Sequence, residues 1–200
     1  MEKYKKDMMR AGISGVLAFV LGVTFSWLVW GDTTPSKSPV KTYENVELSI
    51  RFSYPDSYFL IEYMNATSSQ NLHQQLLLSP DGALSGAMQN NTTTTTVLNL
   101  KESAKVIAID ILGRGEEVDI ADWVRTNATT SYFAFSDKKL ESASVGNKKI
   151  VSYNWSGESD ANTLALIHNG RVFLLSVVYE SPSNDIRNDF ISFLSTMEFI

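Results

Sequence analysis

Residues 163–179 read TLALIHNGRVFLLSVVY, and this stretch decides the fold. Asn169-Gly170 is the dipeptide that type I′ turns prefer, and residues typical of strands flank it on both sides. We therefore predict a hairpin of two strands, Thr163–His168 and Arg171–Tyr179. Val172–Val178 is almost continuously apolar, which is typical of a central strand covered on both faces.

A helix is expected directly after this hairpin. It follows Pro182, takes Ser183 as its N-cap and continues to about Thr196. Its apolar residues recur at helical spacing and form one broad face, which needs a sheet to cover. They are Ile186, Phe190, Phe193, Leu194 and Met197. Glu198–Ile200 is expected to add a last extended piece.

The residues before the hairpin predict further strands. Val46–Tyr54 alternates apolar and polar side chains, which is the period of a half-buried strand. Asp119 is expected to cap a short helix that continues to Asn127, with one apolar stripe. The other predicted strands are Tyr58–Met64, Leu72–Leu78, Ala104–Leu112, Lys139–Val145 and Lys148–Trp155. The pattern predicts an α+β domain with a twisted, mainly antiparallel sheet of six to eight strands flanked by helices.

The N-terminal part of the chain has a different character. Ala11–Trp30 is a run of twenty uncharged residues, and such a helix is about 30 Å long, the thickness of a bilayer's hydrocarbon core. We expect a transmembrane helix. The alternative is a cleaved signal peptide, but the run is longer than the apolar region of such a peptide and lacks an Ala-x-Ala cleavage site. Trp27 and Trp30 then lie at the outer membrane interface.

The charges predict the orientation of this segment. Residues 1–10 carry four Lys/Arg and two acidic residues, and only Lys37 and Lys41 follow the span closely, so the N-terminus is expected in the cytoplasm. The chain is then a single-pass protein of the cell membrane that uses the lipid bilayer as a partner. Its predicted parts are a cytoplasmic segment (1–10), a transmembrane helix (11–30), a Pro/Ser/Thr-rich linker (31–42) and an extracytoplasmic domain (43–200).

The order of these elements resembles the PsbP-like domain family. The resemblance covers about Tyr43–Ile200 and rests on a strand end, the middle helix, the consecutive hairpins and the C-terminal helix. The residues that carry it are Phe52-Ser53-Tyr54-Pro55, Phe190, Phe193, Leu194 and Glu198-Phe199-Ile200. It implies an α/β/α sandwich and a binding or assembly role, as expected for the family's uncharacterised membrane-anchored bacterial members. No catalytic residue is carried over, because the matching positions are core and turn residues.

Few residues in the sequence point to chemistry. The chain has no cysteine, which excludes disulfides, thiol nucleophiles and Cys-ligated metals. His73 and His168 belong to no metal-binding motif, so we expect two strand histidines that face solvent or a polar neighbour. The acidic residues around Asp119 are expected to stabilise a helix N-terminus rather than to bind a cation. We therefore predict no catalytic, cofactor-binding or metal-binding residue.

Aromatic residues offer the clearest candidate for a binding surface. Tyr132, Phe133 and Phe135 follow a polar loop, and they form the candidate exposed patch. Residues 1–10 carry a net charge of +2, which leaves −7 for the remainder of a chain whose formal charge is −5. An acidic domain without a basic stripe is not expected to bind nucleic acid.

These observations predict a non-catalytic, membrane-tethered domain that binds a protein or a component of the cell envelope. One alternative is an envelope hydrolase, which would place His73 or His168 within hydrogen-bond reach of both a serine and a carboxylate. Another is a domain that binds a small molecule or a lipid, which would need a closed apolar pocket of about 300 Å³ or more beneath the sheet.

Overall fold

The computed structural model describes residues 39–66, 72–80, 100, 105–113, 118–145, 148–181 and 185–200. All of them belong to one compact unit, Pro39–Ile200. The predicted membrane helix at residues 11–30, with Trp27 and Trp30, lies outside the described residues. Within the described part of the chain, no helix has the length and apolar character needed to span a bilayer.

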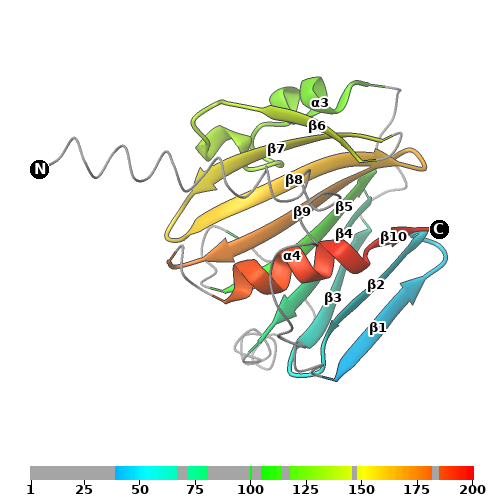
Figure 1. Cartoon of the computed structure of the whole chain (residues 1–200). Helices are drawn as coiled ribbons and strands as arrows, with labels where there is room; N and C mark the ends of the chain where they lie inside the picture. Colours follow the sequence, from blue (N-terminus) through cyan, green and yellow to red (C-terminus); the bar gives the residue numbers. More distant parts are fainter. Residues whose placement is uncertain are drawn as a thin grey trace, which may run out of the picture. The chain divides into compact units, whose positions relative to one another are not determined.

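Seven antiparallel strands form the larger sheet, in the order β3-β4-β5-β9-β8-β7-β6 (Figure 1). The strands are β3 (Phe59–Ala66), β4 (Leu72–Ser79), β5 (Val106–Gly113), β6 (Glu141–Val145), β7 (Lys148–Ser156), β8 (Asp160–His168) and β9 (Arg171–Tyr179). The expected mainly antiparallel sheet is therefore confirmed. Every strand predicted between Tyr58 and Tyr179 is present, with ends shifted by a few residues.

The β8–β9 hairpin has the turn that its sequence predicts. Asn169 and Gly170 both have positive φ, 46° and 71°, as a type I′ turn requires. Strand β9 pairs with β8 on one side and with β5 on the other, and every residue from Val172 to Tyr179 is buried. The central position predicted for this strand is confirmed, because paired strands on both sides satisfy its backbone and both faces are covered.

A second sheet has three strands, in the order β1-β2-β10, and it was not expected as a separate sheet. Its strands are β1 (Val40–Asn45), β2 (Ile50–Pro55) and β10 (Glu198–Phe199). The prediction of one strand from Val46 to Tyr54 is wrong in its first half. Residues 46–49 form the turn between β1 and β2, where Ser49 has a φ of 56° and Val46 is 74% exposed. Local hydrogen bonds hold this turn, including one from the Ser49 N–H to the Val46 carbonyl at 3.1 Å.

The domain also begins earlier than predicted. The linker was expected to extend to Thr42, whereas β1 pairs with β2 from Val40 onward, opposite Pro55. Most side chains of β1 are exposed, so the strand has no apolar pattern that the sequence could reveal. Backbone pairing with β2 is what orders it.

The C-terminal helix α4 (Ile186–Thr196) packs between the two sheets. Its buried residues Ile186, Phe190 and Phe193 lie on the predicted apolar face. The Phe193 ring meets the Phe52 ring of β2 edge-on, with centroids 5.0 Å apart. Asp185 occupies the N-cap position without a capping side-chain hydrogen bond, and the predicted cap, Ser183, lies outside the described residues.

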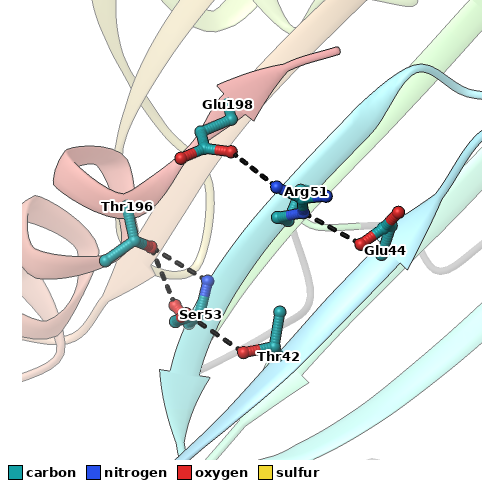
Figure 2. Close-up of polar contacts among 6 residues, drawn as sticks. All are labelled: Thr42, Glu44, Arg51, Ser53, Thr196 and Glu198. Atoms are coloured by element: carbon teal, nitrogen blue, oxygen red, sulfur yellow. Dashed lines mark hydrogen bonds and ion pairs between the residues drawn. The ribbon is translucent and has the colours of Figure 1, made fainter.

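Figure 2 shows how the end of α4 is tied to the small sheet. The Thr196 hydroxyl accepts a hydrogen bond from the Ser53 N–H at 3.0 Å and lies 3.1 Å from the Ser53 carbonyl oxygen. Strand β10 pairs with β2 through only two residues, and Thr196 continues this pairing with a side chain. Beside it, the Arg51 guanidinium lies between Glu44 at 2.9 Å and Glu198 at 3.2 Å.

The opposite face of the large sheet carries α3 (Ile120–Thr126) and the short 3₁₀ helix η2 (Phe133–Phe135). Asp119 caps α3 as predicted, since its Oδ1 accepts from the Ala121 N–H at 2.9 Å. The predicted stripe of α3 is buried; it consists of Ile120, Trp123 and Val124. Helices therefore lie on both faces of the large sheet, and the predicted α+β class with flanking helices is confirmed.

Candidate functional site

The aromatic patch that the sequence predicts is not formed as expected. Phe133 is only 5% exposed, and its ring meets the Tyr153 ring edge-on at 5.5 Å. Tyr132 is half-buried and stacks on Trp155, with ring centroids 4.6 Å apart. Phe135 alone of the three is exposed, by 37%. The predicted exposed patch of three residues is therefore wrong, because the Phe133 ring is buried in the core and the Tyr132 ring packs against that core.

The residues beneath Tyr132 form a buried polar cluster on the same face of the large sheet. Asp110 of β5 is 2% exposed, and its Oδ1 accepts from Gln75 Nε2 at 2.9 Å. His73 Nε2 lies 2.7 Å from the same oxygen. Gln75 and Asp110 are direct partners in the β4–β5 register, and His73 lies two residues earlier on β4, so strand pairing brings all three side chains to one face.

The second carboxylate oxygen of Asp110 is unusual. Oδ2 is buried and has no hydrogen-bond partner among the described residues. A buried carboxylate is costly unless donors surround it, so this oxygen is the point at which the cluster is incomplete. His73 connects the cluster to the surface, since its side chain is 26% exposed whereas that of Asp110 is 3% exposed.

Two tyrosines complete the surroundings of Asp110. Burial, together with the charge of Asp110, raises the pKa of Tyr132 to about 12. Burial also raises the pKa of Tyr153, whose hydroxyl donates to the Ser131 carbonyl at 2.6 Å. Tyr132 has a φ of 60°, a conformation that costs energy for a bulky residue, and its hydroxyl accepts from the Leu100 N–H at 3.2 Å.

This arrangement orients an imidazole toward the surface. A carboxylate that accepts a hydrogen bond from one ring nitrogen fixes the tautomer and the orientation of the ring. The hydrolase alternative requires a serine hydroxyl within hydrogen-bond reach of that histidine. Among the residues that the structure describes, no serine hydroxyl is hydrogen-bonded to His73 or to His168, so only the His–Asp half of such a site is assembled.

Sequence reasoning placed His73 correctly on a strand beside a polar neighbour but missed Asp110. One signal was available. Asp110 is the only charged residue within the apolar run Val106–Leu112, a strand predicted to be buried on both faces. A carboxylate in such a strand needs a donor on the neighbouring strand, and this requirement points to β4.

The other histidine lies at the end of β8 and on the opposite face of the large sheet from Asp110, against Phe173 and Phe199. His168 Nδ1 is 2.6 Å from Lys148 Nζ, and its Nε2 is buried. Burial and the charge of Lys148 lower the pKa of His168.

Two hollows of about 300 and 260 Å³ lie where α3 begins, and both are open to solvent. The first is lined by Val118, Asp119, Ile120, Lys148, Lys149 and Ile167. The second shares three of these residues and continues past β6 and β7. Neither is the closed apolar pocket that a lipid-binding domain would need. No cluster of three or more His, Asp or Glu residues that could hold a metal is found within the described ranges.

Comparisons with known proteins show the fold of the domain. The chain matches no family model and no curated protein sequence. Among solved structures it is similar to the solution structure of cyanobacterial PsbP (CyanoP) from Synechocystis sp. PCC 6803, with a TM-score of 0.52 and 11% sequence identity. The match covers 86% of this chain and 99% of that chain. The described domain therefore has a PsbP-like fold, and a likeness at this identity shows the fold alone.

Proposed function

We propose that the protein is a membrane-anchored PsbP-like module that acts by binding, and that its domain works outside the cytoplasm. Its partner would be a protein or a component of the cell envelope rather than nucleic acid. The observation that carries the proposal is the position of the folded unit, which begins at Pro39, only eight residues after the apolar run Ala11–Trp30.

The short connection limits where the domain can act. Residues 31–38 span at most about 29 Å when fully extended, so a helix anchored at residues 11–30 keeps β1 close to the bilayer surface. Trp27 and Trp30 suit the outer interface, where indole rings favour the headgroup region. The four Lys/Arg residues within 1–10 favour a cytoplasmic N-terminus. Membership of a family of membrane-anchored bacterial PsbP-like proteins would agree with this organisation.

A binding role is favoured over catalysis by the state of the buried cluster. Asp110 is only 2% exposed, and the described contacts of His73 include its carboxylate but no nucleophile. A module that acts by contact needs a rigid, well-packed scaffold rather than a reactive group, and the two sheets with α4 supply one.

The anchor is tested by fractionation of cells that express the full chain. We expect the protein to remain in the membrane pellet after carbonate washing, and external protease to cleave the domain in spheroplasts. The double substitution Leu17→Arg with Val20→Arg should release it, because each charge at the centre of a span costs about 2.5–3.5 kcal/mol. Val40→Arg, at the exposed edge strand, is the matched control and should stay in the pellet. Release of the unsubstituted chain by carbonate would contradict the anchor.

The binding role is tested by affinity purification from detergent-solubilised membranes of the native host. We expect one partner to be recovered in constant proportion with the full chain and to be lost after mild denaturation of the domain. Repeated purification without a specific partner would contradict the binding role while leaving the anchor intact.

The His73–Asp110 contact favours an envelope hydrolase as the second candidate. A fluorophosphonate probe for activated serines would then label the native chain and leave His73→Ala unlabelled. Absence of labelling in both proteins removes this candidate.

A further inference from the structure

A lysine and a histidine meet at the end of the large sheet. Lys148 is the first residue of β7 and His168 the last of β8, two positions beyond the pair Ile150↔Leu166 on each strand. Both side chains therefore lie on the same face of the sheet. Lys148 Nζ is 2.6 Å from His168 Nδ1, which is a hydrogen bond between two groups that both carry positive charge when protonated.

The surroundings of this pair are aromatic rather than acidic. Lys148 Nζ lies 4.9 Å from the centre of the Phe199 ring, and the His168 ring lies 4.9 Å from the same ring. Among the described residues, no carboxylate forms an ion pair with Lys148. Its amine thus has a ring face and an imidazole where most lysines have water or a carboxylate.

Lys149, the next residue, has a different environment. Its side chain is 80% exposed, and Nζ lies 3.7 Å from Asp119 Oδ2 at the start of α3. Successive residues of a strand point to opposite faces, so the two lysines are separated although they are adjacent in sequence. The remaining charged neighbour in the sheet register is Arg171, which lies opposite His168. The Arg171 guanidinium donates a hydrogen bond to the Glu47 carbonyl at 2.8 Å.

Electrostatics agrees with this geometry. Burial lowers the pKa of Lys148. Burial and the charge of Lys148 lower the pKa of His168, whereas a hydrogen bond with the Ile200 backbone acts in the opposite direction. A larger fraction of this amine than of an ordinary lysine is therefore unprotonated, and the unprotonated amine is the nucleophile.

We propose that Lys148 is a nucleophilic lysine that forms imines with small aldehydes. The Nζ lone pair attacks the carbonyl carbon, and the proton released from nitrogen passes to His168 Nδ1. His168 returns this proton to the alkoxide oxygen, which gives the carbinolamine, and the second N–H proton then follows the same route to the hydroxyl. The C–O bond breaks, water leaves, and a C=N bond to Lys148 remains.

Competitive labelling of the full chain in detergent tests the proposal. The protein is treated at neutral pH with limiting formaldehyde and cyanoborohydride, which converts each imine into a methylated amine. Cleavage after glutamate yields residues 142–158, a peptide that contains both Lys148 and Lys149, and fragment ions assign the label. We expect Lys148 to be labelled at least about three times faster than Lys149 in the native protein, and at about the same rate in denaturant. A native ratio no greater than the ratio in denaturant overturns the proposal.

Two variants test whether the faster labelling of Lys148 is caused by its aromatic environment or only by its exposure to solvent. Phe199→Ala removes the ring that covers the amine, and the native labelling ratio should fall toward the value in denaturant. Phe59→Ala removes an exposed ring of β3 and should leave the ratio unchanged. A ratio that is unaffected by Phe199→Ala in a folded variant would contradict the assigned role of the aromatic environment.

Discussion

The two faces of the seven-stranded sheet are covered in different ways. On one face, α4 and the three-stranded sheet enclose a core that includes the rings of Phe52, Phe173 and Phe193. On the other face, α3 and η2 enclose a second core that contains the buried polar cluster around Asp110. Strand β5 contributes to both, since Ile109 and Asp110 are consecutive, both buried, and point to opposite faces.

This difference indicates that the stability of the two faces depends on different physical interactions. The α4 face is stabilised by apolar area and close packing, so loss of atoms there leaves a cavity. The α3 face also depends on the partners of a buried carboxylate, so loss of a donor there leaves a charge without compensation. Substitutions on each face separate these two contributions to stability.

The largest effect is expected on the α4 face. Phe52 is fully buried and packs against Phe193 and Tyr43, whose ring centroid lies 5.0 Å away. Phe52→Ala should lower the free energy of unfolding by about 3–5 kcal/mol, because the cavity cannot collapse between two sheets and a helix. Urea unfolding followed by tryptophan fluorescence measures it. Phe59→Ala, at an exposed site, is the control and should change stability by less than about 0.5 kcal/mol.

The second effect concerns the α3 face. His73→Ala should lower the free energy of unfolding by about 2 kcal/mol, because the buried Asp110 loses the His73 contact and keeps only the described hydrogen bond from Gln75. Asp110→Asn removes the buried charge at nearly constant shape and should cost less than His73→Ala does. In the double variant the effect of His73→Ala should largely disappear. Additive costs in this cycle would show that His73 and Asp110 are not coupled.

A pH effect of similar size is expected from Tyr132. Its pKa is about 12 in the folded chain and about 10 when unfolded, so the folded state holds the proton more tightly. The contribution of this residue to stability is complete below pH 10 and is lost as the pH rises through 12, by about 3 kcal/mol. Stability measured between pH 9 and 12 should therefore fall less steeply in Tyr132→Phe than in the unsubstituted chain. Parallel curves for the two proteins would contradict the role of this hydroxyl.

The smallest effect is expected where α4 meets the small sheet. Thr196→Val removes the hydroxyl that contacts both backbone groups of Ser53, and it should cost about 0.5–1 kcal/mol because water replaces the contacts at this exposed site (Figure 2). Thr42→Val removes a weaker contact to the Ser53 hydroxyl at 3.4 Å and should be nearly neutral. Equal effects of the two substitutions would show that Thr196 does not extend the strand pairing.

The elements that the sequence predicted well are those that local physics decides. Asn169-Gly170 forms a type I′ turn because both residues tolerate positive φ, whatever the rest of the chain does. Asp119 and the apolar stripe of α3 likewise follow from capping and helical spacing within a few residues. The alternation of Ile50, Phe52 and Tyr54 predicted one buried strand face correctly.

The errors concern residues whose structure depends on distant partners. Val46–Ser49 continues the alternation of β2 but forms a turn, because β1 needs a connection to pair with β2. Phe133 was expected on the surface and is buried, because the ring of Tyr153 on β7 lies against it. Neither partner is visible in the local pattern.

By itself, the sequence determined the strands of the large sheet, the β8–β9 turn and the apolar faces of α3 and α4, since periodicity and turn chemistry act over a few residues. Tertiary structure alone decided that β10 pairs with β2 and that His73 meets Asp110, 37 residues away in sequence. Such contacts depend on which strands become neighbours. That choice is made by the burial of whole faces, and many sequences with the same local pattern can satisfy it in different ways.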